Sequence, residues 1–306
     1  MLDNILVLLQ IPVLNIQLLL DGLFIGSIFA LAAYGLALVW GVMNVKNLAQ
    51  GDFVMMGGYL AWAMSNPKYM GDFAIHPIAT LPIAIVLMFG FGWVIYFLII
   101  KRVVYRDMFT SLLATFGLAI VIQQLLNHMF GPEIQAAESG YDTRSFFEGL
   151  VTIANIKFIA FVLTAILAAI VVIFMRYSRM GQAIRATAQD ARAAKVQGID
   201  TENVYAFTYA LNAAICGAAG VLISMIWVIQ PFFGLAYSIR CFVVVTAAGL
   251  GNLPGVITAG LGLGVVEQFG GFVMGSEFQQ AIVVIMLVLV LIVRQIQQSW
   301  QRQAVV

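Results

Sequence analysis

Eight long apolar stretches, joined by shorter polar connections, limit what this chain can fold into more than any other feature. A helix needs roughly 20 apolar residues to cross a hydrocarbon core of about 30 Å. Because 62% of the 306 residues are hydrophobic and only 9% are charged, no soluble domain of this size could cover its surface. The sequence therefore predicts an all-α polytopic integral membrane protein, with about 8–10 transmembrane or half-spanning helices in one domain, residues 1–306. The stretches lie near residues 17–43, 48–65, 78–100, 108–130, 156–175, 204–229, 239–274 and 277–293.

The seventh stretch, 239–274, is too long for one crossing. Gly249, Gly251, Pro254 and Gly255 lie in its middle, where glycine loosens the backbone and proline removes an amide donor. We predict a helix break at these four residues, with two short or half-spanning helices around a turn.

Glycines recur four residues apart in several of the stretches. Small residues at this spacing let helix backbones approach closely in lipid, where no hydrophobic force drives association. We interpret them as packing contacts inside one subunit, with a homo- or heterodimer interface as the alternative. The pairs are Gly22 and Gly26, Gly251 and Gly255, Gly260 and Gly264, and Gly271 and Gly275.

The basic residues are distributed unevenly between the two sides of the predicted bundle. When successive loops are assigned to alternating sides, eleven of the fifteen basic residues fall on one side, which the positive-inside rule makes cytoplasmic. The other side receives Lys68, Arg144, Lys157 and Arg240, in or beside its loops, and its longest loop, 131–155, holds four acidic residues. This puts the C-terminus inside, and the N-terminus outside if the broken stretch crosses twice. The cytoplasmic set is Lys46, Lys101, Arg102, Arg106, Arg176, Arg179, Arg185, Arg192, Lys195, Arg294 and Arg302.

A polar segment of 28 residues, 176–203, interrupts the apolar stretches. Within it, residues 181–197 are rich in alanine and contain no proline, so they favour a helix, and Gly198 is the residue type that closes one. We interpret the segment as a cytoplasmic docking surface for a partner protein. The alternative is an amphipathic helix on lipid headgroups, although its face has no large apolar anchors. The polar side chains at helical spacing on one face are Arg185, Gln189 and Arg192.

Several kinds of chemistry have no motif in the chain. None of the five lysines follows a glycine, as a phosphate-binding loop requires, so an ATPase would have to be another polypeptide. His76 and His128 have no second histidine at metal-ligand spacing, and we expect no metal site. Cys216 and Cys241 lie in apolar stretches and are expected to be free core thiols. The serines lack the context of a hydrolase nucleophile, and the near-neutral charge gives no indication of a nucleic-acid partner.

Three polar residues, Asn47, Gln50 and Asp52, lie where the first apolar stretch turns into the second. An ionisable group near the hydrocarbon is costly and normally faces a partner or a water-filled pathway. Our hypothesis is that this turn lines a translocation pathway. The alternative is that Asp52 is an interfacial carboxylate that caps a helix.

Further polar residues lie inside later stretches. Glu267 either faces the pathway or hydrogen-bonds to the terminus of a broken helix. Asn212, Gln123 and Gln124 are additional pathway candidates, and interhelical hydrogen bonding explains them equally well.

Three segments resemble a known family. Residues 47–53, Asn-Leu-Ala-Gln-Gly-Asp-Phe, look like the Asn-Phe-Ala-His-Gly-Glu motif of the permease subunits of branched-chain amino acid ABC importers. Residues 181–200 are similar to that family's cytoplasmic coupling loop, and residues 249–255 match its Gly-Leu-Gly-x-x-Pro-Gly element. The resemblance is closest to the shorter, LivH-type permease. Gln50 in place of the usual histidine and Asp52 in place of the commoner glutamate are the departures, and they leave the substrate open.

The resemblance implies the permease subunit of an ATP-driven importer for branched-chain amino acids, in a bacterial inner membrane. It implies three kinds of partner, namely a homologous second permease, two cytoplasmic ATPases and an external substrate-binding protein. The chain itself would be no enzyme and hold no cofactor, because the ATPases bind ATP. Similar permeases carry urea, short amides or aromatic acids, and a stand-alone channel, facilitator or ion-coupled symporter is the alternative from another class. The ATPase-coupling residues would be Arg185, Gln189, Asp190, Arg192, Ala194 and Gly198. The pathway residues would be Asn47, Gln50, Asp52, Asn212 and Glu267.

Overall fold

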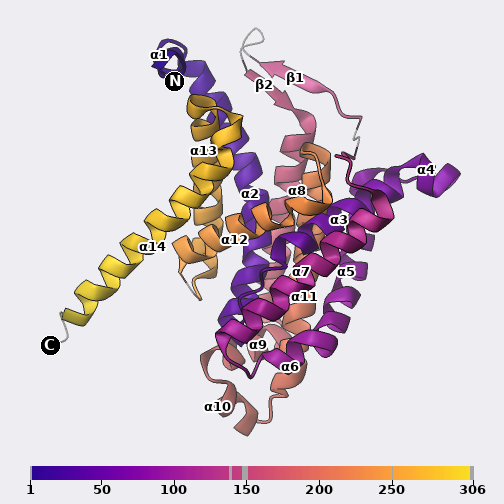
Figure 1. The fold of residues 1–306 in the computed structure, drawn as a ribbon, viewed down its shortest axis with the longest axis vertical. Coiled ribbons are helices and arrows are strands. Elements are labelled where there is room, and N and C mark those ends of the chain that lie inside the picture. The colour runs from indigo at the N-terminus through magenta and orange to yellow at the C-terminus, as the bar shows by residue number, and fades with distance from the viewer. Residues whose placement is uncertain (1, 138–139, 147–150, 250, 304–306) are drawn as a thin grey trace.

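The computed structural model describes the whole chain except residues 1, 138–139, 147–150, 250 and 304–306. Glu138 and Glu148, two of the four acidic residues of the 131–155 loop, and Leu250, in the predicted helix break, lie outside the described residues. Among the described residues, eight helical segments are long and apolar enough to cross a membrane. This confirms the all-α polytopic fold class (Figure 1).

The elements follow one another in a simple order. The main helices are α1 (Leu2–Gln10), α2 (Pro12–Met43), α3 (Gln50–Ser65), α5 (Leu81–Ile95), α7 (Met108–Phe130), α8 (Asn155–Tyr177), α9 (Arg179–Gln189), α10 (Ala191–Val196), α11 (Thr201–Ile226), α12 (Gly234–Ala248), α13 (Leu253–Met274) and α14 (Gln279–Gln303). Short helical turns are α4 (Pro67–Met70), η1 (Gly71–Phe73), η2 (Pro77–Thr80), η3 (Tyr96–Ile100), α6 (Lys101–Val103), η4 (Pro231–Phe233) and η5 (Ser276–Phe278). Strands β1 (Thr143–Phe146) and β2 (Val151–Ala154) form an antiparallel hairpin.

The two ends of the bundle carry different loops (Figure 1). One end, here called the hairpin end, carries β1 and β2 and the start of α2. The other, the basic end, carries α6, α9 and α10. Ion pairs join neighbouring helices near both ends: Lys157 of α8 binds Asp21 of α2 at 2.7 Å, and Lys101 of α6 binds Glu202 of α11.

Helices α2 and α11 form the centre of the bundle. Their most apolar segments are almost completely buried, whereas α8 and α14 expose most of theirs. Helix α2 has 32 residues and is therefore about 48 Å long at 1.5 Å per residue. Helix α14 leaves the bundle at an angle (Figure 1), so its apolar surface is available to lipid or to another subunit.

Glycines bring α2 and α13 into backbone contact. A Cβ atom added to Gly26 would lie 2.7 Å from the carbonyl oxygen of Gly260, and one added to Gly264 would lie 2.2 Å from that of Gly22. Packing inside one subunit is therefore the correct interpretation for these two pairs. It is wrong for Gly251, which has nothing within 4 Å of an added Cβ and adopts a φ of +81° in a turn.

The predicted break in the seventh stretch is confirmed. Helix α12 ends before Gly249, whose φ of +94° is accessible to glycine without strain. Asn252 caps α13 by accepting a hydrogen bond from the amide of Gly255 at 3.1 Å, and Pro254 lies in the first turn of that helix. The proline therefore starts the second helix, at a position where its missing donor costs nothing.

The second apolar stretch does not form a full crossing. Helix α3 has 16 residues and is about 24 Å long, shorter than a hydrocarbon core of about 30 Å. Its C-terminal residues lie beside Gln135, at the hairpin end. Its N-terminus therefore has to lie inside the bundle.

Candidate functional site

Residues 44–49, between α2 and α3, turn back into the interior of the bundle. Asn44 ends α2 in the left-handed conformation, with a φ of 54°. The side-chain amide of Gln50 then donates to the carbonyl oxygen of Ala32 at 2.8 Å. Because Ala32 lies eleven residues before the end of α2, the chain has returned roughly 16 Å along that helix. We call residues 44–50 the re-entrant turn.

Three of the predicted pathway residues meet at this turn. The side-chain nitrogen of Asn47 donates to the side-chain oxygen of Gln50 at 3.3 Å, and that of Gln50 donates to Oδ1 of Asn212 on α11 at 2.9 Å. All three side chains are buried. The structure therefore joins residues that lie more than 160 positions apart in the sequence, and interhelical hydrogen bonding is what Asn212 provides here.

Two hydroxyl groups that the sequence analysis missed fix the backbone of the turn. Ser238 of α12 accepts from the amide of Gly51 at 2.8 Å and donates to the carbonyl of Leu48 at 2.7 Å. Thr115 of α7 accepts from the amide of Leu48 at 3.2 Å. A hydroxyl inside an apolar span is the signal that could have identified them.

Asp52 follows Gly51 in the first turn of α3 and is 1% exposed. Its Oδ1 accepts from the side-chain amide of Gln123 on α7 at 2.8 Å, whereas Oδ2 has no hydrogen-bond partner among the described residues. Gly234 lies against it so closely that an added Cβ would be 2.0 Å from Oδ1. The interfacial capping role is wrong, because Asp52 is buried and the N-cap of α3 is Ala49, which makes no side-chain capping bond.

Glu267 forms a buried ion pair that neither sequence-based alternative included. Nε of Arg240 on α12 donates to both carboxylate oxygens of Glu267 on α13, at 3.2 and 3.1 Å, and Nη2 also donates to Oε1. Arg240, which the sequence places in or beside an external loop, lies inside α12 and is 9% exposed. Ser238 and Arg240 are two residues apart, or about 200° around the helix, so they face opposite sides of α12. Glu267 is therefore not part of the re-entrant turn.

The predicted coupling segment consists of two helices, and the single helix expected over 181–197 is wrong. Ser178 caps α9 by accepting from the amide of Gly181 at 2.8 Å. Asp190 is extended and accepts from the amides of Arg192 and Ala193, at 2.8 and 3.0 Å, so it ends α9 and caps α10. Both amides favour the ionised carboxylate, which places the pKa of Asp190 below its ordinary value.

The exposure of the coupling residues differs along the segment. Ile184 and Thr187 of α9 are buried against the bundle. The apolar side of α9 is therefore not available to lipid headgroups, which the alternative interpretation required. Ala194 is buried as well, so it makes no direct contact with a partner in this conformation. The remaining coupling residues are exposed, and they are Arg185, Gln189, Asp190, Arg192 and Gly198.

A cavity of about 510 Å³ at the basic end lies between the coupling segment, the re-entrant turn and the break between α12 and α13. Arg185 and Gln189 of α9 line it on one side. Asn44, at the start of the re-entrant turn, and Gly251, between α12 and α13, line it on the other. The coupling segment, the re-entrant turn and the break between α12 and α13 therefore border the same cavity.

A bundle of membrane-crossing helices that encloses a buried polar turn is the arrangement of a membrane transport protein. A model of the family described as the permease component of branched-chain amino acid transport systems matches residues 18–291. The chain belongs to this family, and it is a multi-pass integral membrane protein.

Individual relatives agree with the family assignment. The chain is 30% identical over 294 residues to the high-affinity branched-chain amino acid transport system permease protein LivH of Escherichia coli, covering 91% of this chain and 93% of the relative. It is 30% identical over 293 residues to the corresponding protein BraD of Pseudomonas aeruginosa, covering 91% and 94%. A probable LivH of Methanocaldococcus jannaschii is 28% identical over 274 residues, covering 86% and 83%.

Proposed function

We propose that this chain is the LivH-type permease subunit of an ATP-driven importer for branched-chain amino acids, and that it forms the translocation pathway together with a homologous second permease. The family and the relatives support the transport of branched-chain amino acids. The direct energy source has to lie outside this chain, because its sequence has no phosphate-binding loop.

The observation that carries the proposal is the exposed coupling segment at the basic end. Val196, at the end of α10, is 87% exposed, and Arg192 and Lys195 on the same short helix are exposed too. Covering this apolar side chain with a partner would remove it from water, which is favourable, and the basic side chains beside it would complement an acidic surface on that partner. The basic end is cytoplasmic by the positive-inside rule, so the partner there is a cytoplasmic ATPase that binds ATP.

The same segment provides a route from the ATPase to the pathway. Helix α9 packs against α2, α8 and α11, and Arg185 and Gln189 face the cavity that Asn44 and Gly251 also line. Closure of two ATPases on ATP would move α9 and, through its packing against α2, the re-entrant turn that follows α2. Asn47, Gln50, Asp52 and Asn212 would then open alternately to each side.

The other partners belong to other surfaces. An external substrate-binding protein would dock on the hairpin end, and the second permease on exposed apolar helices such as α14. Lipid covers the rest, in a bacterial inner membrane.

Reconstituted uptake tests the proposal. Vesicles carrying this chain with its second permease and ATPases, ATP inside, and leucine plus the binding protein outside should accumulate leucine. Omitting either ATP or the ATPases should abolish accumulation. Uptake by this chain alone would instead identify a facilitator or a symporter, and selective uptake of urea, short amides or aromatic acids would correct the substrate.

The coupling surface has a matched pair of variants. Val196→Asp should prevent co-purification of the ATPases with this chain, because it places a charge in the proposed apolar contact. Gln197→Asp changes the next exposed residue and should leave the complex intact. If both variants retain the ATPases equally, α10 is not their docking site.

A further inference from the structure

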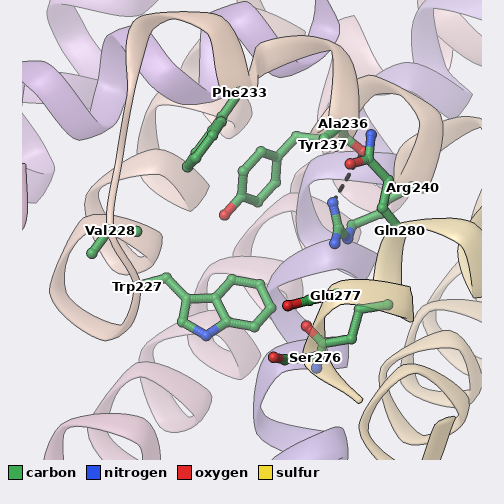
Figure 2. Close-up of a pocket in the computed structure, with 10 residues that line it drawn as sticks. Trp227, Val228, Phe233, Ala236, Tyr237, Arg240, Ser276, Glu277 and Gln280 are labelled. Atoms are coloured by element: carbon green, nitrogen blue, oxygen red, sulfur yellow. Dashed lines mark hydrogen bonds between the residues drawn. The ribbon is translucent and has the colours of Figure 1, made fainter. Parts of the chain in front are cut away.

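A second site lies at the hairpin end, apart from the re-entrant turn. A cavity of about 330 Å³ opens between the α11–α12 connection, the first turns of α12 and the start of α14. Its volume falls within the range of about 300–1,000 Å³ typical of small-molecule sites. Figure 2 shows the guanidinium of Arg240 pointing into it between Tyr237 and Glu277, with Trp227 on the opposite side. The lining residues that carry the argument are Trp227, Phe233, Ala236, Tyr237, Arg240 and Glu277.

Arg240 keeps part of its hydrogen-bonding capacity for this cavity. A guanidinium has five N–H groups. Nε and Nη2 each donate to Glu267, and Nη1 donates to the carbonyl oxygen of Ala236 at 3.2 Å (Figure 2). Two N–H groups, one on each terminal nitrogen, therefore have no acceptor among the described residues. A guanidinium with an N–H group available on each terminal nitrogen can bind a carboxylate through both of its oxygens.

Aromatic rings fix the guanidinium and form an apolar wall. The rings of Phe29 and Tyr237 lie 5.3 and 5.4 Å from the guanidinium carbon of Arg240, within cation–π distance. Trp227 lies beside Phe29, with ring centres 5.8 Å apart, and Phe233 completes the apolar part of the lining. The pocket therefore presents an immobilised cation next to an aromatic surface.

A negative charge lies on the rim of the same pocket. Glu277 of η5 is exposed and lines the opening, whereas the carboxylate of Glu267 is already paired with Arg240. The pocket thus offers one site for a carboxylate, a nearby site for a cation and an apolar surface across from them.

We propose that this pocket is an outer reception site for an amphipathic α-amino acid. The carboxylate of the amino acid binds the unused edge of Arg240, its ammonium group faces Glu277, and its apolar side chain packs on Trp227 and Phe233. This inference rests on the proposed function and extends it, because it assigns substrate contact to α12 and the 227–233 segment, away from the re-entrant turn.

A purely structural role for the ion pair explains less. Linking α12 to α13 requires only the bonds between Arg240 and Glu267. It does not require a cavity on the far edge of the guanidinium or a second carboxylate at the rim. Glu267 also has a positioning role in the proposed site, because it holds Nε and Nη2 so that the remaining donors point outward.

Equilibrium binding to the purified full chain in lipid nanodiscs tests the site without ATP or partners. The probe is radiolabelled leucine, with leucinamide and 4-methylpentanoate as competitors. Leucinamide lacks the carboxylate and should compete at least tenfold more weakly than leucine. 4-Methylpentanoate lacks the ammonium group and should compete at an intermediate level. Equal competition by leucine and leucinamide would overturn the proposal, and so would the absence of saturable leucine binding.

A matched pair of variants locates the bound amino acid without disturbing the ion pair. Ala236→Trp fills the cavity and should weaken leucine binding at least tenfold. Leu235→Trp places the same side chain at the neighbouring position, which is exposed and does not line the cavity, and should change binding less than twofold. Gel filtration checks that both variants fold. Unchanged binding by Ala236→Trp would show that leucine binds elsewhere.

Uptake by the assembled importer separates this inference from the proposed function. If the wild-type assembly imports leucine and the Ala236→Trp assembly imports it at the same rate, the pocket proposal fails and the proposed function stands. If the wild-type assembly does not import leucine although its chain binds leucine in nanodiscs, the proposed function fails and the site remains.

Discussion

Two glycines of α13, two residues apart, should respond in opposite directions to the same substitution. Gly264 touches α2, where an added Cβ would lie 2.2 Å from the carbonyl oxygen of Gly22 and 2.4 Å from Cα of Gly26. Ordinary contact begins at 3.4 Å, so Gly264→Ala requires the two backbones to separate by roughly 1 Å, which forfeits up to half of each contact energy. Gly262 has nothing within 4 Å of an added Cβ and is exposed.

The expected magnitudes follow from two opposing terms. Overpacking a tight interface costs about 1–3 kcal/mol, and replacing glycine by alanine inside a helix contributes about 0.5–1 kcal/mol of stability. Gly264→Ala should therefore lower the free energy of unfolding by up to about 2.5 kcal/mol. Gly262→Ala has only the favourable term and should raise it by about 0.5–1 kcal/mol.

Unfolding of the purified chain by SDS in mixed micelles, followed by far-ultraviolet circular dichroism, measures both variants. The comparison is internal, because both positions lie on one helix and carry the same substitution. If the two variants shift the unfolding free energy equally, or if Gly264→Ala is the more stable, then α2 and α13 do not contact each other through these glycines.

Three further predictions concern the charged residues. Glu267→Gln leaves Arg240 buried without its counter-ion and should lower the free energy of SDS unfolding by about 3–5 kcal/mol. The apolar double variant Arg240→Met with Glu267→Leu should recover most of this loss. A double variant no more stable than Glu267→Gln would contradict this prediction. Asp52→Asn keeps an oxygen that can accept from Gln123, so assembly should be normal while leucine uptake falls at least tenfold; unchanged uptake would remove the charge of Asp52 from the pathway. The pKa of Asp190 is lowered by the amides it caps, so ionised Asp190 stabilises α10 at all pH values above about 4 and loses this effect as the pH falls through the lowered pKa. The protection factors for amide exchange at residues 191–197, measured against an unstructured peptide at the same pH, should therefore fall only below about pH 4 in the wild type. Asp190→Asn, whose side chain still caps the helix, should not show this fall, and an identical acid response in that variant would argue against the capping role.

The sequence predicted features that depend on local composition. Apolar length identified the membrane class and most of the crossings, and the glycines and proline at 249–255 identified the helix break, because both signals act through the neighbouring backbone. Gly26 and Gly264 were recognised as packing residues by their spacing alone.

Local composition could not predict the depth at which a helix begins in the bundle, or which residues of different helices pair with each other. The apolar stretch at 48–65 indicates how long a helix can be but not how deep in the bundle it begins. That depth is set by hydrogen bonds that Ser238 and Thr115, on helices far away in the sequence, accept from the backbone at the start of α3. Arg240 and Glu267 are 27 residues apart, on either side of the break, so no single-helix spacing relates them. The break at Asp190 had a local signal that the alanine content concealed, because an aspartate within such a segment can cap a new helix.

The hydrogen bonds of the re-entrant turn also oppose the entry of water into this part of the bundle. A continuous file of water through this part of the bundle would have to replace the bonds from Gln50 to Ala32 and Asn212, and from Gly51 to Ser238. At about 0.6–1 kcal/mol for each bond, three bonds hold a leaking conformation to about one molecule in 20 to one in 150. At this population the three bonds make a leak infrequent without abolishing it, so a tighter seal has to come from the apolar groups packed around the turn.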